Sequence, residues 1–149
     1  MYDSKARRIL LALKKRGFGE GKWNGIGGRV EEGETVEDAA VREAQEEARV
    51  EVSPDTLVRR GSIRFSFENR PELDRDVHIF FTEEWKGEPI ETGEMRPRWH
   101  DAARLPYEEM WIADKDWLPK MLAGKVIAGR VRLSGSGDRI LDMEIKDSV

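Results

Sequence analysis

Apolar and polar positions in the first third of the chain follow two different periods. The run Ile9 to Leu13 is short and wholly apolar, and a basic loop, Lys14-Lys15-Arg16-Gly17, follows it, which predicts a buried strand. From Val36 to about Ala48 there is no Pro or Gly, and apolar residues recur every four positions, which predicts a helix. Thr35 stands where an N-cap is expected, with Asp38 three residues on.

The second half of the chain is mostly extended in pattern. Aromatic and β-branched residues gather in short segments separated by turn-forming residues. The expected strands are Leu57-Val58, Ser62 to Phe67, Val77 to Phe81 and Glu94 to Trp99, and a hairpin joins Val126 to Leu133 with Ile140 to Ile145. A second helix is predicted around Trp117 to Ala123. Strands mixed with two helices predict an α/β (α+β) domain with a mixed sheet.

Length and composition limit the classes of function. The 149 residues suit one domain, residues 1–149. The net charge of −4 argues against a protein that holds polymeric nucleic acid by neutralising its phosphates. The absence of cysteine removes disulfides and thiolate chemistry together. No apolar run approaches the roughly 20 residues of a membrane span, and the chain starts without a signal-peptide pattern. We therefore expect a soluble, cytoplasmic protein that does not act at a membrane.

Chemistry is concentrated between residues 17 and 51. Residues 17–33 hold seven of the 14 glycines, a density typical of a backbone that turns sharply or approaches another group closely. On the helix that follows, Glu43, Glu46 and Glu47 stand at i, i+3 and i+4, so their carboxylates should converge on one face. Three such charges repel unless a cation lies among them. Because every donor is an oxygen, the expected cation is Mg²⁺, with Mn²⁺ as a substitute.

A solvated acidic helix is the alternative interpretation, since most Glu-rich helices carry no metal. The glycine-rich loop favours the metal site, because its amide and carbonyl groups are delivered to the start of the helix. Arg42 has two expected partners, Glu46 four residues on and Glu34 in the loop. Residues 31–51 carry a net charge of −7, so the rest of the chain carries +3.

This segment resembles the Nudix box, the signature of the Nudix hydrolase family. The matching positions are Gly28, Glu34, Arg42, Glu43, Glu46 and Glu47. Further segments are similar to the branch of animal MutT homologues that hydrolyse oxidised purine nucleoside triphosphates: Lys14 to Gly19, Trp23 to Gly25, Pro71 to Leu73, Asp76 to His78, Glu94 to Pro97 and Met110-Trp111. The resemblance implies a Nudix-type α/β/α sandwich with a mixed sheet and a catalytic loop followed by a helix.

The resemblance also implies an activity, the Mg²⁺-dependent hydrolysis of oxidised purine nucleoside triphosphates to the monophosphate and pyrophosphate. The favoured substrate is 8-oxo-dGTP, and the role is sanitation of the nucleotide pool. It implies that Glu43, Glu46, Glu47 and Glu94 bind the metal together with a carbonyl of Gly27 or Gly28. One of Glu43, Glu46 and Glu47 orients or deprotonates the attacking water, and Arg42 belongs to the catalytic set. Divalent ions neutralise phosphate oxygens and position the nucleophile, as phosphoryl transfer requires.

The substrate contacts follow from the same resemblance. Lys14 and Arg29 are expected to meet the phosphates, with a solvated surface cation as the alternative for each. The residues expected at the purine base are Phe18, Asn24, Phe65, Phe67, Met95, Trp111 and Asp114. An indole stacks on any purine, and side-chain amides and carboxyls hydrogen-bond its edges. Core packing is the alternative for Phe65, Phe67 and Met95.

Three features of the sequence depart from the family pattern. Arg49 stands where the box has a glycine that often ends the helix with positive φ, so we expect the helix to run on or to end differently. Ala113-Asp114 stands where the family has two adjacent aspartates that bind the base. With one carboxyl lost, we expect the enzyme to accept a narrower range of oxidised purines. Only seven residues precede Arg8, so we expect either that the chain begins late or that residues 2–7 contribute less than the usual full first strand. An open sheet edge would then allow a dimer as well as a monomer.

Two other functions compete with the leading one. The same metal site could serve another nucleoside diphosphate derivative or the 5′ end of an RNA. Enzymes for these substrates share the fold and the box, and only their pocket residues select the substrate. A third hypothesis is a non-catalytic, nucleotide-sensing module. Retention of the three glutamates and Arg42 argues against it, and the acidic net charge argues against long RNA. The expected partner is therefore a small nucleotide and not polymeric nucleic acid.

Overall fold

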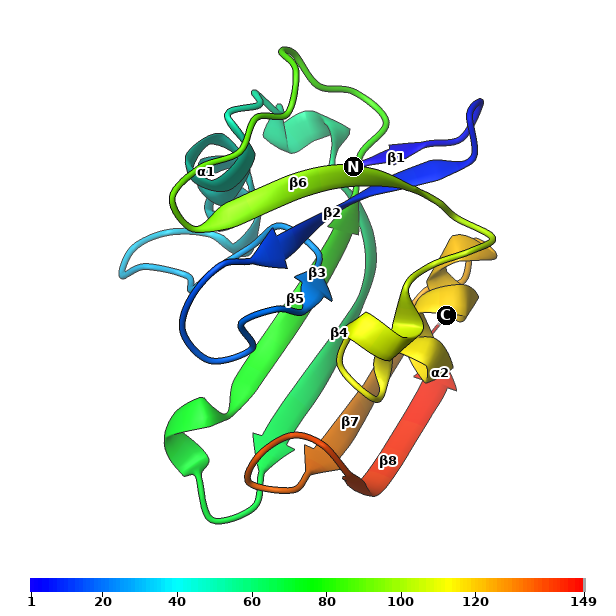
Figure 1. Ribbon diagram of the computed structural model, residues 1–149. Coiled ribbons are helices and arrows are strands. Elements are labelled where there is room, and N and C mark those ends of the chain that lie inside the picture. Colours follow the sequence, from blue (N-terminus) through cyan, green and yellow to red (C-terminus); the bar gives the residue numbers. More distant parts are fainter. Residues whose placement is uncertain (149) are drawn as a thin grey trace. The chain divides into compact units, whose positions relative to one another are not determined.

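The computed structural model describes residues 1–148, and Val149 lies outside the described residues. The chain divides into two compact units, one made of Met1–Val58 and Phe81–Glu109, the other of Arg59–Phe80 and Met110–Val149. Each unit holds one four-stranded sheet and one α-helix (Figure 1). The expected α+β class is confirmed, whereas a single domain over residues 1–149 stays a prediction.

The sheet of the first unit is built on one buried strand, β2, Arg8–Lys14. β6, Met95–Asp101, pairs with β2 along its whole length, and the two strands lie side by side in Figure 1. The two-residue strands β1, Tyr2–Asp3, and β3, Trp23–Asn24, pair with the two ends of β2. All these pairings are antiparallel. The buried strand predicted over Ile9 to Leu13 is confirmed, and a short first strand precedes it.

The helix of the first unit, α1, spans Val36–Ala48 and begins where its cap predicted. The Thr35 hydroxyl accepts a hydrogen bond from the amide of Asp38, at 3.0 Å. Its apolar face contributes to a cluster of small and β-branched residues that the structure buries. The cluster consists of Ala44, Ala48, Val50 and Val52, with Met1, Ile26, Val41, Leu57 and Trp85 packed against it. This packing holds the carboxylate-bearing face of α1 in place.

The expectation that α1 would run on past Ala48, or would end differently from a helix closed by glycine, is wrong. Arg49 takes the left-handed conformation, with φ 59° and ψ 32°, and its amide donates to the carbonyls of Ala44 and Gln45. The helix therefore ends as a glycine would end it, although a side chain stands there. Burial of Val50 and Val52 in the cluster explains why the chain turns at this point despite the strain.

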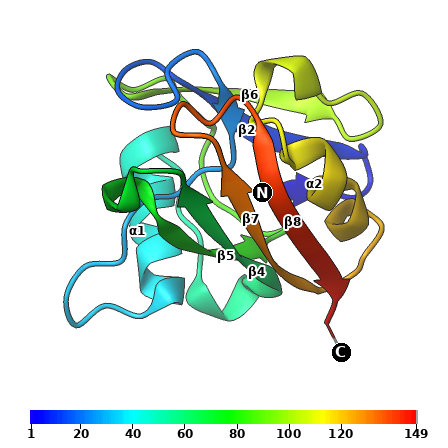
Figure 2. The same ribbon diagram turned by 90° about the horizontal axis from the view of Figure 1, so that it is seen from below.

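The sheet of the second unit has the order β5-β4-β7-β8. Its strands are β4, Val58–Phe67, β5, Arg75–Phe81, β7, Ile127–Leu133, and β8, Ile140–Asp147; Val58 and Phe81, at strand ends, belong to the first unit. β4 and β7 are parallel, whereas β7 and β8 form the expected antiparallel hairpin (Figure 2). The predicted mixed sheet is therefore this one.

β4 covers two segments that the sequence predicts as separate strands, Leu57-Val58, of which Val58 belongs to β4, and Ser62 to Phe67. Gly61 lies between them, and a β-carbon there would fall 2.2 Å from the carbonyl oxygen of Ile127 on β7. The glycine thus permits close approach of two strands, and it does not mark a break. A glycine inside a strand often has this role.

The helix of the second unit, α2, spans Asp114–Leu122 and lies against β7. It begins three residues before the predicted start at Trp117, because Asp114 and Asp116 occupy a first turn that favours acidic residues. Three short 3₁₀ turns complete the chain, η1, Pro54–Thr56, η2, Pro71–Leu73, and η3, Tyr107–Glu109. No helix within residues 1–148 is long and apolar enough to span a membrane.

Candidate functional site

Arg42 on α1 is the centre of an ion-pair network in the first unit. Its guanidinium donates to both carboxylate oxygens of Glu34, at 2.8 and 3.1 Å, and to the backbone oxygen of Arg29, at 2.9 Å. It also donates to Glu43, at 2.9 Å, and to Glu46, at 3.3 Å. Both partners expected from the sequence, Glu34 and Glu46, are therefore confirmed. These contacts tie the glycine-rich loop to the acidic face of α1.

Glu34 and Glu43 raise the pKa of Arg42 further above its ordinary value through hydrogen bonds to its charged form. The same bond lowers the pKa of Glu34, which also accepts from the amide of Glu31, at 2.9 Å. Both groups therefore stay ionised over a wider pH range than an unpaired arginine or glutamate would. A planar guanidinium suits this role because it can meet a carboxylate with two parallel bonds.

Glu43 lies in close contact with the glycine-rich loop. A β-carbon at Gly28 would fall 2.1 Å from Oε1 of Glu43 and 2.4 Å from its Cδ. The side chain of Glu43 is only 13% exposed. A side chain at position 28 would therefore displace the carboxylate of Glu43 from its place beside the backbone.

Glu47 is the buried carboxylate of the site, with 8% of its surface exposed. Its Oε2 accepts a hydrogen bond from the amide of Gly27, at 3.1 Å. Burial raises the pKa of Glu47 to about 7, and the neighbouring charges of Glu43 and Glu94 raise it as well. The Gly27 bond and the charge of Lys14 oppose this shift only in part. A buried carboxylate that is close to two others is stabilised as an anion by a cation.

The expected convergence of Glu43, Glu46 and Glu47 into one ligand cluster does not appear within residues 1–148, where no three acidic or histidine side chains are arranged around a common metal position. Arg42 engages Glu43 and Glu46, whereas Glu47 turns to the amide of Gly27. Each carboxylate has thus found compensation within the protein. All the donors are oxygens, and the buried Glu47 lies near the charges of Glu43 and Glu94, so the residues fit a hard divalent cation.

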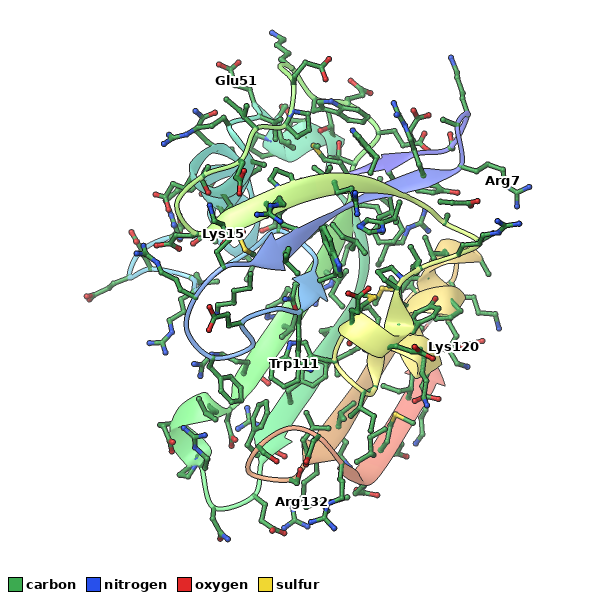
Figure 3. The ribbon with its side chains drawn as sticks, in the orientation of Figure 1. Arg7, Lys15, Glu51, Trp111, Lys120 and Arg132 are labelled. Carbon is green, nitrogen blue, oxygen red and sulfur yellow. The ribbon has the colours of Figure 1, made fainter. Side chains whose placement is uncertain are left out.

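The loop before β6 brings Glu94 to this region. Glu94 is exposed and pairs with Arg16, at 2.9 Å. The hydroxyl of Thr92 donates to the carbonyl of Glu47, at 3.3 Å, and the ammonium of Lys15 donates to the carbonyl of Thr92, at 2.9 Å. Lys15, labelled in Figure 3, follows the end of β2. The loop, α1 and β2 are thereby joined, which explains how Glu94 acts on the pKa of Glu47.

The remaining predicted residues of the first unit lie near the glycine-rich loop. The ammonium of Lys14 donates to the carbonyl of Phe18, at 2.7 Å, and its charge reaches Glu47. Arg29 and Phe18 are exposed, and Met95 is buried. The side-chain amide of Asn24 donates to the carbonyl of Lys22, at 3.0 Å. Their predicted contacts with substrate stay predictions.

The second unit holds the other predicted base-binding residues. Phe65 and Phe67 alternate along β4 and are half-buried. Trp111, on the segment that leads into α2 and labelled in Figure 3, meets Phe67 edge to face, with ring centres 6.0 Å apart. Asp114 is buried, and its Oδ1 accepts a hydrogen bond from the indole of Trp117, at 3.1 Å. A half-buried indole and an oriented carboxyl therefore stand close together in sequence and in the same unit.

Four contributing residues were not found from the sequence. Arg16 and Thr92 hold the Glu94 loop, Trp117 orients Asp114, and Gly137 lies against Trp111. Only Trp117 carried a signal, since it follows Asp114 by three residues on a helix. The others act across the fold and leave no pattern in the chain.

The chain is similar to known proteins over most of its length. The NUDIX domain family matches residues 1–121. The chain is 49% identical over 128 residues to the oxidized purine nucleoside triphosphate hydrolase of Danio rerio, covering 86% of this chain and 80% of that protein. It is 44% identical over 141 residues to the protein of the same name from Mus musculus, covering 95% of this chain and 88% of the relative.

Solved structures give the same fold at low identity. The MutT protein of Bacillus halodurans has a TM-score of 0.81 and 21% identity, covering 94% of this chain and 90% of that one. A MutT NUDIX hydrolase from Burkholderia pseudomallei has a TM-score of 0.62 and 24% identity, covering 70% of this chain and 81% of that one.

Proposed function

Because the chain belongs to the NUDIX family, we propose that it hydrolyses oxidised purine nucleoside triphosphates, with 8-oxo-dGTP as the favoured substrate, to the nucleoside monophosphate and pyrophosphate. The observation that carries this proposal is the identity to two vertebrate hydrolases of that name over most of both chains. The crowded carboxylates of α1 support hydrolysis at phosphate. The role of the enzyme is then to remove oxidised purines from the nucleotide pool.

Members of the family generally require a divalent metal ion, and we assign Mg²⁺ here, with Mn²⁺ as a substitute. The groups that would hold it are Glu43, Glu46, Glu47, Glu94 and a carbonyl of Gly27 or Gly28. When bound, the ion neutralises charge on the phosphate oxygens and lowers the pKa of water. The acidic segment and the oxygen-only donor set support a hard cation.

The side chains of the first unit then have distinct tasks. Arg42 fixes Glu43 and Glu46 on one side and the glycine-rich loop, through Glu34, on the other. One of Glu43, Glu46 and Glu47 orients the attacking water and accepts its proton. Lys14 and Arg29 meet the phosphates. Because little covalent chemistry falls to the protein in phosphoryl transfer, such positioning accounts for most of its contribution.

In the second unit, Trp111 provides an aromatic face for the purine, beside Phe65 and Phe67, and Asp114 hydrogen-bonds a base edge. Trp117 keeps Asp114 in one orientation. The assignment of Phe18, Asn24 and Met95 to the base rests on the family resemblance alone. Stacking of a base on an aromatic side chain is worth about 1–3 kcal/mol, enough to affect selection.

A pyrophosphate-release screen tests the proposal. Normal and oxidised purine triphosphates are compared by kcat/KM with Mg²⁺, with Mn²⁺ and with chelator. The expected result is metal-dependent release with 8-oxo-dGTP far ahead of dGTP. Equal kcat/KM for the two would refute the sanitation role. A preference for another nucleoside diphosphate derivative or for the 5′ end of an RNA would identify that molecule as the substrate instead. We also propose a cytoplasmic location and a monomeric or dimeric state. Light scattering distinguishes the monomer from the dimer.

Two substitutions distinguish an enzyme from a non-catalytic, nucleotide-sensing protein. Glu46→Gln and Glu47→Gln remove carboxylates and keep their size. An enzyme loses pyrophosphate release and retains nucleotide binding in these variants. A sensor shows no release in the unaltered protein and no change in the variants.

A further inference from the structure

The hairpin loop between β7 and β8 lies directly against Trp111. Gly137, in this loop, is buried and has φ 78°. A β-carbon there would fall 2.4 Å from Cζ3 of Trp111 and 3.3 Å from Cε1 of Phe67. No real β-carbon approaches another heavy atom so closely, so any side chain at this position would move the indole. The backbone of Gly137 therefore forms one wall of the place where the ring of Trp111 rests.

The loop that carries Gly137 is held by its own polar groups. The hydroxyls of Ser134 and Ser136 both donate to Oδ1 of Asp138, at 2.8 and 2.7 Å. The amide of Gly137 donates to the carbonyl of Ser134, at 2.8 Å, and the amide of Arg139 donates to the hydroxyl of Ser134, at 3.1 Å. Ser134 itself is buried. Such a network leaves the loop few alternative conformations.

Phe67, next to Gly137, also bounds the indole. Phe67 ends β4, its amide donates to Asp74, at 3.0 Å, and it pairs in register with Leu133, the residue before the loop. Its ring meets Trp111 at 73°, an edge-to-face arrangement. Trp111 is thus bounded by a strand end and by a loop that grows from the neighbouring strand.

We propose that residues 134–139 are a positioning element for Trp111 and so determine how strongly the enzyme selects the purine base. This proposal rests on the proposed function, in which Trp111 stacks on the base. A stacking platform acts only when its plane is set before the ligand arrives, because ordering it afterwards subtracts from the binding free energy. Gly137 sets that plane by contact, and Asp138 holds Gly137 in place.

The test compares two glycines that both have positive φ, so that alanine brings the same kind of backbone strain at each position. Gly137→Ala should raise KM for 8-oxo-dGTP about tenfold, a loss within the range of one stacked base, and reduce its preference over dGTP, with kcat changed much less. Gly124→Ala, also in the second unit, has φ 89° but open space around its β-carbon, so it should keep the KM and the preference of the unaltered enzyme. Binding of 8-oxo-dGMP without metal, measured by calorimetry, should weaken in Gly137→Ala alone.

Two further variants keep the proposal falsifiable if Gly137→Ala folds poorly. Asp138→Ala adds no atom near the indole and should still raise KM and reduce the preference. In Gly137→Ala with Trp111→Phe, the smaller ring should relieve the contact, so KM should not exceed that of Trp111→Phe alone. Equal effects of Gly137→Ala and Gly124→Ala, with a normal unaltered enzyme, would overturn the positioning role alone. An unaltered protein that neither turns over nor binds oxidised purine nucleotides overturns the proposed function and, with it, this role.

Discussion

The carboxylate of Glu43 lies against the backbone of Gly28, so close that the two residues fit only because Gly28 has no side chain. Glu43 is largely shielded from solvent and receives a hydrogen bond from Arg42. The glycine and the glutamate, 15 residues apart, therefore form one structural unit of the site.

Gly28→Ala should lower kcat by on the order of 100-fold, because a β-carbon displaces the Glu43 carboxylate by more than the site tolerates. The variant should remain folded, since Gly28 is exposed and needs no unusual φ. Steady-state pyrophosphate release checks this. Gly25→Ala is the matched control, because nothing lies within 4 Å of its β-carbon. If both variants keep normal kcat, the contact has no role in turnover.

Arg42→Lys should reduce kcat by on the order of tenfold, because an ammonium cannot bind both oxygens of Glu34 while it holds Glu43 and Glu46. The urea midpoint should fall as well, since the glycine-rich loop loses its connection to α1. Arg70→Lys changes an exposed ion pair with Glu72 and should leave the midpoint unchanged. Indistinguishable midpoints and rates in the two variants would contradict a central role for Arg42.

The metal-free protein should lose stability as pH rises from about 5 to 8. In the folded state the pKa of Glu47 is about 7, above the 4.5 of an ordinary glutamate. A raised pKa contributes stability that is fully present below about pH 4.5 and is lost as pH rises through 7. The free energy of unfolding should therefore decrease by roughly 1 kcal/mol per pH unit at the steepest point, measured by urea unfolding in chelator.

Glu47→Gln should flatten this dependence, because an amide does not titrate and still accepts the Gly27 bond. Glu46→Gln, at an exposed position, should leave the slope intact and serves as its control. Mg²⁺ should stabilise the unaltered protein more at pH 8 than at pH 6, since the ion then meets an ionised Glu47. A slope that survives in Glu47→Gln would assign the pH dependence to another group.

Arg49→Gly should raise the free energy of unfolding by about 1 kcal/mol, because glycine adopts the left-handed conformation without strain. Arg49→Ala keeps a β-carbon and should give no such gain. Both variants should keep normal kcat, since Arg49 ends α1 beyond the glutamates. A gain shared equally by the two would point to the charge of Arg49 rather than to its backbone.

Ala113→Asp should broaden the substrate range towards oxidised adenines, because it restores a second carboxyl beside Asp114. We expect the ratio of kcat/KM for oxidised dATP to that for 8-oxo-dGTP to rise at least about fivefold. Ala113 is fully buried, so the urea midpoint must be followed in parallel. Ala113→Ser, which adds a hydroxyl and no charge, is the control, and an unchanged ratio in Ala113→Asp would refute the idea.

Local signals in the sequence predicted the elements that local forces determine. The helix from Val36 to Ala48 has its cap, its spacing and its freedom from Gly and Pro within 14 residues, and its bounds are confirmed. The two-residue strands β1 and β3 exist only through pairing with β2, so no local pattern announces them. Arg49 was misjudged for a similar reason, since burial of the following residues outweighs its backbone preference.

The candidate site divides in the same way. Helical spacing correctly predicted the pairing of Arg42 with Glu46, because i to i+4 geometry is independent of the rest of the fold. The same spacing could not predict that Glu47 is buried and accepts a hydrogen bond from a loop amide, whereas Glu46 is exposed. The contact of Thr92 with Glu47 joins residues 45 positions apart, and such pairs are specified by the tertiary fold alone.

The order β5-β4-β7-β8 has a consequence for how the chain is made. β4 is synthesised some sixty residues before β7, its parallel neighbour. The two strands pair in register, from Gly61 with Ile127 to Phe67 with Leu133. During translation β4 and β5 must therefore wait with one edge unpaired until the last quarter of the chain leaves the ribosome. Exposed strand edges of this kind are where nascent chains aggregate. Premature termination before β7 would thus release a fragment whose second unit cannot close, and chaperones would be its principal protection.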